Sequence, residues 1–549
     1  MASVSTAAAS GGFALSSHDR ERLRRRVKEA LRRARRGGEA LAAITVRVGT
    51  EVDPSAVVAA SRRGAEAAGS RGAAAAGQGS GGEPAGSRGG IAAGQGSGGE
   101  PAGSRGGIAA GQGSGGEPAG SRGGIAAGQG SGGEPWFCFE QPDRDRAAVA
   151  ALGVAVAIEA GGKDRFTAVA KRWRSLASRA ACDPPDGPRG CGPIAVGGFA
   201  FAPDGGQSPP WAGFAAASLH VPEVAFVRRG DDVRLTFCVL AQPDDTVDDL
   251  VARVAARAAS LRDGVGLPLL DPSPAGRYRV VSAMPPEHYE QAVARGVDRI
   301  AAGELDKIVL AREVQVHAPV DHDPAAVLGV LREAFPSCHL VCAGRGDAAF
   351  VAASPELLIR RDGERAATLA LAGSARRSAD PAVDDHLGER LMRSAKDREE
   401  QAIVTRRIAQ TLRPYSVWVT AHDEPEVVKM ANIQHLGTPI RAQLSKSVSV
   451  VELAGLLHPT PAVGGEPLAV AAPLIPALEG LDRGWYAGPV GWTDLDEDGE
   501  FVVGLRCALL RGPVARCYAG VGVVRDSDPA AELAETEVKL QALLPVLAG

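Results

Sequence analysis

The sequence predicts an α+β protein built around a large apolar core. Its 549 residues, 45% of them hydrophobic, allow two to four domains by length or one large α+β domain. Short segments rich in β-branched and aromatic residues are closed by turn pairs such as Asp362-Gly363, which are typical of hairpins. Apolar residues also recur at helical spacing, for example over residues 286–300. Strands and amphipathic helices are therefore both expected.

The composition argues against several classes of protein. A net charge of -4 does not suit a nucleic-acid-binding surface. No run reaches the eighteen apolar residues that a membrane-spanning helix needs. The eight cysteines are scattered without CxxC pairs, so neither a zinc site nor a disulfide framework is expected. A reducing compartment, and hence a cytoplasmic location, follows as the expectation.

The chain is expected to open with a disordered segment and a basic helix. Residues 1–17 are rich in Ala and Ser, and residues 18–36 have a helical pattern with many arginines. Because residues 1–17 lack acids, a transit peptide is one interpretation. The acids Asp19, Glu21 and Glu29 favour the other, a surface helix that opens the fold.

A tandem repeat separates the first predicted strand, residues 40–48, from the second, residues 135–142. Residues 69–134 repeat the seventeen-residue unit GQGSGGEPAGSRGGIAA. This unit is mostly Gly, Ala and Ser, so it buries too little apolar surface to offset the entropy of ordering it. A solenoid is the alternative, but one Ile in each unit supplies no core. We expect a disordered insertion inside a domain, because a longer loop costs little.

The rest of the first half, residues 18–275, is expected to be an α+β unit without a catalytic cluster. The predicted elements are helices at 166–178 and 247–261 and strands at 194–201, 214–219, 223–228 and 233–239. A boundary rich in Pro and Gly follows at 268–277, and residues 283–547 form the second half.

The second half is expected to alternate helices and strands. Its predicted helices are 286–300, 324–334 and 381–412, its strands are 305–316, 339–343, 349–353 and 367–372, and its loops are 373–376 and 457–466. The last stretch predicts strands at 485–492, 501–510 and 515–524, followed by a helix that Asp528 caps.

This last stretch gathers groups suited to an anionic substrate and a hard metal ion. Glu532, Glu535 and Lys539 recur at i, i+3 and i+7 and therefore share one helix face. Arg506 interrupts an apolar strand, and Gly520 leaves space where backbone can approach a ligand. The alternatives are a solvated Glu–Lys surface pair on the helix and an edge-strand position for Arg506.

Several sequence segments resemble those of one enzyme family. GPVGWTDLDEDGEFVVGLRCALL, YAGVGVV and ETEVKL are similar to the C-terminal signature of the chorismate-utilising enzymes, most closely the isochorismate synthases. The resemblance covers about residues 283–547, with weaker likeness back to Trp136. It implies a large fold of mixed, mostly antiparallel sheets packed together, with helices on the outside.

The resemblance also implies a reaction. In isochorismate synthases a water attacks C2 of chorismate while the C4 hydroxyl leaves, and the conversion is reversible and depends on magnesium. The phrases KIVLAR and SPELL place Lys307 as the base and Glu356 as the acid. A lysine that acts as a base needs a pKa well below about 10.4, and the glutamic acid needs a raised pKa. Without the resemblance, Lys307 would be interpreted as an edge-strand charge.

The resemblance assigns further roles at the same site. Glu400 and Glu535 match the family's magnesium carboxylates, with Glu532 and Glu399 as additional or water-mediated ligands. Gln401 departs from the histidine that often follows the metal glutamate. The implied substrate-binding residues are Gly373, Ser374, His435, Ala462, Val463, Arg506, Gly520 and Lys539.

Two other functions stay open. A salicylate synthase would use the same base and acid and then eliminate pyruvate, and a non-catalytic binding protein could share the fold. Ammonia-using relatives work with a glutaminase, and no glutaminase subunit is expected here. The expected partner is chorismate, with no nucleic acid or membrane, and the expected state is a monomer or weak homodimer. Menaquinone and siderophore or salicylate biosynthesis are the pathways implied.

Overall fold

The computed structural model describes residues 13–64, 133–184, 186–271, 275–431 and 433–549. Every element named below belongs to one compact unit. Among the described residues no helix is both long and apolar enough to cross a membrane. All eight cysteines are free thiols in this structure.

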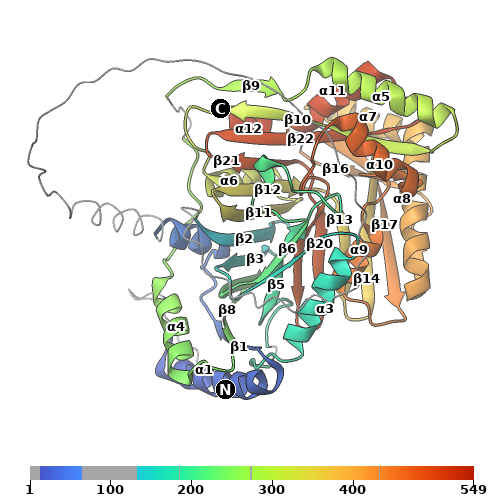
Figure 1. The fold of residues 1–549 in the computed structure, drawn as a ribbon. Coiled ribbons are helices and arrows are strands. Elements are labelled where there is room, and N and C mark those ends of the chain that lie inside the picture. The colour runs from blue at the N-terminus through green and yellow to red at the C-terminus, as the bar shows by residue number, and fades with distance from the viewer. Residues whose placement is uncertain (1–12, 65–132, 185, 272–274, 432) are drawn as a thin grey trace, which may run out of the picture. The chain divides into compact units, whose positions relative to one another are not determined.

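One large sheet has twelve strands drawn from both halves of the chain (Figure 1). Its order is β1-β8-β7-β3-β2-β11-β12-β21-β22-β10-β18, with β9 paired to β10, and each pairing is antiparallel. The strands are β1 (Ala40–Arg47), β2 (Gly133–Gln141), β3 (Ala147–Leu152), β7 (Val224–Arg229), β8 (Asp232–Ala241), β9 (Arg279–Ser282), β10 (Lys307–His317), β11 (His339–Gly346), β12 (Ala348–Ser354), β18 (Gly465–Glu466), β21 (Cys507–Arg511) and β22 (Val514–Val523).

The second sheet has ten strands. Its order is β15-β17-β14-β13-β20-β19-β5-β6-β4, with β16 paired to β17, again antiparallel throughout. The strands are β4 (Val156–Ala160), β5 (Ile194–Phe199), β6 (Ala217–Val221), β13 (Leu357–Asp362), β14 (Arg365–Arg376), β15 (Ser416–Ala421), β16 (Glu426–Lys429), β17 (Ile433–Leu444), β19 (Pro489–Asp494) and β20 (Gly499–Val503).

Helices lie over the sheets (Figure 1). The buried apolar residues form two core clusters. Alternate residues of β2 point to opposite faces, so Phe137 joins a core shared by both sheets and Trp136 joins a second core. The helices are α1 (Ser17–Gly37), α3 (Arg165–Ala177), α4 (Val247–Ser260), α5 (Pro286–Ala301), α6 (Pro324–Ala334), α7 (Pro381–Arg393), α8 (Ala395–Leu412), α9 (Val450–Leu457), α10 (Leu468–Glu479), α11 (Pro529–Leu540) and α12 (Leu544–Ala548). The predicted α+β class with antiparallel sheets is confirmed.

Several predicted elements need correction. The helix predicted over 381–412 is two helices, because Ser394 adopts an extended backbone and its hydroxyl caps α8 at the amide of Asp397. The loop predicted at 373–376 belongs to β14, where a bulge at Gly373 shifts the register. The strand predicted over 485–492 begins only at Pro489, as β19.

The strand predicted over 501–510 is two strands that belong to different sheets. Strand β20 ends at Val503 in the ten-stranded sheet, and β21 begins at Cys507 in the twelve-stranded sheet. Between them Arg506 has a positive φ of 47°, which is unusual for a residue with a side chain. The chain therefore crosses from one sheet to the other at Arg506.

The predicted disordered segments, 1–17 and 69–134, lie mostly outside the described residues. Gly133 and Glu134 are exceptions, because they open β2. The prediction of disorder is also wrong for residues 13–17, since Leu15 is buried and Ser16 caps α1, which begins at Ser17. Helix α1 is confirmed as a folded helix, with Leu23 and Val27 among its buried residues.

An arginine of α6 joins the two parts of the chain that flank the repeat. Arg332 lies 2.6 Å from the carboxylate of Asp53, which precedes the repeat, and 2.7 Å from the carboxylate of Glu140, which follows it. Ser55 donates a further hydrogen bond to Glu140. Both ends of the insertion are therefore held to the same helix.

Candidate active site

Lys307 begins strand β10 and is completely buried. Its Nζ lies 2.8 Å from Oε1 of Glu400, which α8 brings to this point. Gly522 of the neighbouring strand makes room for the pair, because a Cβ there would lie 2.5 Å from Glu400 Oε1 and 2.7 Å from Lys307 Cε. The predicted base and one predicted metal ligand are thus in direct contact.

Glu356 occupies the junction between β12 and β13 and is 3% exposed. Ser354 fixes its backbone, since the Ser354 hydroxyl accepts a hydrogen bond from the Glu356 amide at 3.2 Å. Burial raises the pKa of Glu356 to about 8, although the positive charges of Lys307 and Arg506 act to lower it. The side chain is therefore largely protonated at neutral pH, as a general acid requires.

Arg506 and His435 form a partly buried polar pair. Arg506 Nη2 donates to His435 Nε2 across 3.0 Å, and His435 Nδ1 donates to the carbonyl of Gly373 across 2.9 Å. Burial, together with the charges of Arg506 and Lys539, lowers the pKa of His435 to about 3. His435 is therefore neutral and carries its proton on Nδ1.

The bulge in β14 supplies two of the predicted substrate-binding residues. Gly373 has a φ of 64°, in the left-handed region that favours glycine, and its carbonyl turns toward His435. The hydroxyl of Ser374 lies 3.2 Å from His435 Nδ1 and also bonds to Glu535. The bulge thus links the histidine to helix α11.

Helix α11 carries the predicted acids and lysine. Lys539 Nζ lies 2.9 Å from Glu535 and donates to the carbonyl of Gly520 at 2.9 Å. Burial acts to raise the pKa of Glu535, but the charge and hydrogen bond of Lys539, the charge of Lys396 and a hydrogen bond from Ser374 together lower it. Glu532 is buried and pairs with Lys396 of α8 at 2.7 Å, and burial raises its pKa. The Glu535–Lys539 pair is only partly exposed, so the interpretation as a fully solvated surface pair does not fit this helix.

The carboxylates fit a magnesium ion by their chemistry. Magnesium prefers oxygen ligands and often takes only one or two carboxylates together with waters and substrate. Glu400 and Glu535 lie on different helices and both act electrostatically on Lys396. Within the described ranges no three metal-ligating side chains converge on one point. Glu399 is exposed on α8.

The remaining predicted residues lie in the turn before β18. Val463 is 3% exposed, Ala462 is partly buried, and the Val463 carbonyl accepts a hydrogen bond from Arg483 at 2.8 Å. The side chain of Gln401 has a structural role, because its amide nitrogen donates a hydrogen bond to the Ala370 carbonyl at 3.0 Å.

Sequence reasoning assigned no role to two residues beside the site, Lys396 and Tyr486. Lys396 is four residues before Glu400 and shares its helix face, which is a signal that the spacing contained. Nothing in the sequence pattern pointed to Tyr486. Its hydroxyl lies close to Gly520, because a Cβ added at that glycine would be 2.7 Å from the hydroxyl oxygen.

The two antiparallel sheets carry a buried lysine, a buried glutamic acid and a partly buried arginine, side chains suited to an enzyme that acts on a small anion. The chain belongs to the chorismate binding enzyme family, whose model matches residues 126–548. It is an enzyme of the isochorismate synthase group of isomerases, which confirms the predicted resemblance.

Individual relatives support this assignment. The chain is 37% identical over 411 residues to the salicylate biosynthesis isochorismate synthase of Pseudomonas aeruginosa, covering 75% of this chain and 84% of the relative. It is 32% identical over 360 residues to isochorismate synthase MenF of Bacillus subtilis, covering 65% and 75%. The solved structure of MenF, the menaquinone-specific isochorismate synthase from Escherichia coli, has a TM-score of 0.62 at 27% identity and covers 75% of this chain and 88% of that one.

Proposed function

We propose that the protein converts chorismate to isochorismate, reversibly and with magnesium. The observation that carries the proposal is the coexistence of Lys307, fully buried on β10, with Glu356, whose pKa of about 8 keeps it protonated at neutral pH. Isomerisation needs a base for the attacking water and an acid for the leaving hydroxyl. These two buried groups supply one of each.

In this mechanism each residue has one task. Lys307 accepts the proton of the water that attacks C2, and Glu356 donates a proton to the hydroxyl that leaves C4. Arg506, which is partly buried, would bind a substrate carboxylate, assisted by Lys539. Neutral His435 holds Arg506 in place at 3.0 Å.

Magnesium would be held by Glu400 and Glu535, with Glu532 beside them. When bound, the ion would neutralise negative charge on the substrate carboxylate. The support from this chain is that two helices offer carboxylate oxygens, α8 through Glu400 and α11 through Glu535 and Glu532. The ring of chorismate would lie against Ala462 and Val463.

Product analysis tests the proposal. Incubation of the purified protein with chorismate and magnesium is expected to yield isochorismate, identified by chromatography and mass. Formation of salicylate and pyruvate would instead identify a salicylate synthase, and no turnover would support a non-catalytic binding protein. Exhaustive chelation is expected to abolish turnover, and undiminished activity would contradict the roles of Glu400 and Glu535. Menaquinone and siderophore or salicylate biosynthesis are the proposed destinations, which neighbouring genes would distinguish.

A further inference from the structure

Glu479 and Arg483 form an ion pair that solvent does not reach. Their side chains are 0% and 2% exposed, and Arg483 Nε and Nη2 lie 3.0 and 2.5 Å from the two carboxylate oxygens. Burying two ions is costly because both lose their hydration, so such a pair is weak evidence for stability. The role of the pair is therefore sought in the backbone segments that it holds together.

The pair joins two segments of the proposed active site. Arg483 Nη1 donates to the carbonyl of Val463 at 2.8 Å, and Nη2 donates to the carbonyl of Val309 at 2.9 Å. The amide of Ala311 donates to Glu479 Oε1 at 2.7 Å. Val309 and Ala311 are on β10, the strand that Lys307 begins, and Val463 is a proposed wall of the ring pocket. One guanidinium thus contacts both segments.

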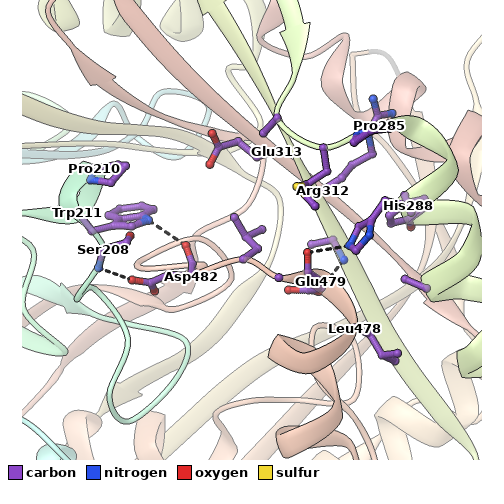
Figure 2. Close-up of a pocket in the computed structure, with 17 residues that line it drawn as sticks. Ser208, Pro210, Trp211, Pro285, His288, Arg312, Glu313, Leu478, Glu479 and Asp482 are labelled. Carbon is purple, nitrogen blue, oxygen red and sulfur yellow. Dashed lines mark hydrogen bonds between the residues drawn. The ribbon is translucent and has the colours of Figure 1, made fainter. Parts of the chain in front are cut away.

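The turn that carries the pair is anchored on its other side (Figure 2). His288 of α5 bonds to the carbonyl of Glu479 at 3.3 Å. The Asp482 carboxylate accepts from the amide of Ser208 at 3.0 Å, and its carbonyl accepts from the Trp211 indole at 3.1 Å. These residues line a cavity of about 230 Å³ between the turn and α5. The turn is therefore fixed independently of the substrate site.

We propose that Arg483, held by Glu479, is a positioning residue that sets the ring-pocket segment against the strand of the catalytic lysine. It acts through the backbone of Val463 and Val309 and contacts neither of the two proton-transferring groups. The inference rests on the proposed function, because the strand and the pocket matter only if the substrate lies between them.

A double variant separates positioning from stability. Glu479→Leu with Arg483→Met removes both charges and keeps similar volumes, an exchange that is often neutral or stabilising for a fold. The contacts to Val463 and Val309 are lost. We expect a melting temperature within a few degrees of wild type and a kcat/KM for chorismate about 10²-fold lower, since a displacement of about 1 Å can cost that much. KM is expected to rise and kcat to fall, because both the pocket and the base strand are displaced.

Two further variants complete the experiment. Arg483→Lys keeps the charge beside Glu479 but cannot reach both carbonyls, so its kcat/KM is expected between wild type and the double variant. Arg345→Met is the matched control, because Arg345 is also buried and donates to a backbone carbonyl, that of Gly344, at 3.0 Å. Its kcat/KM is expected within about twofold of wild type, since it shares no partner with the site.

A folded double variant with wild-type kcat/KM would overturn the inference. Failure of both the double variant and Arg483→Lys to fold, with the control folded, would overturn it too, because the pair would then be structural. If the wild-type protein does not turn over chorismate, the proposed function fails instead. Calorimetric binding of chorismate then decides the inference: the double variant should bind about tenfold more weakly, and unchanged affinity would overturn it.

Discussion

Arg506 and His435 are joined by a hydrogen bond of 3.0 Å that fixes the state of both side chains. An arginine can only donate, so Nε2 of His435 must be unprotonated and its proton resides on Nδ1. The arginine reaches this position from a backbone with a φ of 47°, at the point where the chain leaves one sheet for the other. The change of sheet thus places a partly buried cation beside His435.

Replacing the proposed base should abolish turnover. Lys307→Gln removes the only group proposed to accept the proton of water, and its side chain is shorter and uncharged. We expect kcat to fall by about 10²- to 10⁴-fold, with circular dichroism and chorismate binding close to wild type. Near wild-type kcat in a folded variant would sink the assignment of Lys307.

Glu356→Gln should bind chorismate and turn it over slowly. An amide cannot supply the proton that the departing hydroxyl needs, so the loss is expected in kcat, by about 10²- to 10⁴-fold. Steady-state kinetics measure kcat and KM separately. A loss confined to KM would mean that Glu356 binds substrate and transfers no proton.

The pH profile should report the same residue. Because burial raises the pKa of Glu356 from 4.5 to about 8, kcat/KM is expected to decline above about pH 8 as the acid ionises. The folded state also holds a proton that the unfolded chain loses, so this group's contribution to stability declines as pH rises from about 5 to about 8. Denaturant titrations should show this decline in wild type relative to Glu356→Gln. Parallel stability profiles for the two proteins would contradict the raised pKa.

Gly522→Ala should damage the site by sterics alone. The new Cβ would lie 2.5 Å from Glu400 Oε1 and 2.7 Å from Lys307 Cε, so the ion pair must move. We expect about 1–3 kcal/mol of lost stability and about a 10²-fold loss of kcat/KM. Gly161→Ala is the matched control, because nothing lies within 4 Å of its added Cβ. Equal kinetics in the two variants would refute the requirement for glycine.

Shortening the repeat should be almost neutral. Each halving of a flexible loop changes the free energy of unfolding by only about 0.6 kcal/mol, in the stabilising direction. Each unit pairs one Arg with one Glu, so net charge hardly changes. With three units removed, we expect a melting temperature within a few degrees of wild type and unaltered kcat. A loss of several kcal/mol by calorimetry, or a new oligomeric state by light scattering, would rule this out.

Local patterns predicted most elements of the second half. Helix α6 spans the predicted residues 324–334, and α11 begins after the predicted cap at Asp528, whose side chain accepts from the amide of Ala531. The break at Ser394 was missed because its cause, a side-chain cap on α8, looks in sequence like an ordinary polar position inside a helix.

Tertiary relationships could not be predicted from the pattern. The apolar segments before and after Arg506 are both buried. Their sequence therefore looks the same whether the chain continues in one sheet or crosses to the other. The roles of Lys307 as base and Glu356 as acid were assigned from the resemblance to the isochorismate synthases, and the residue pattern alone did not indicate them. The contact of Lys307 with Glu400 depends on how α8 packs on the sheets, and no spacing along the chain encodes it.

The attachment of Arg332 to Asp53 and Glu140 has a consequence for the gene. The two flanks of the insertion are tied to a third element of the protein, so their positions do not depend on how many units lie between them. Each unit is a whole number of codons, and slippage during replication can add or remove one without shifting the reading frame. Gain or loss of a unit is therefore expected to leave the residues on either side of the insertion in place.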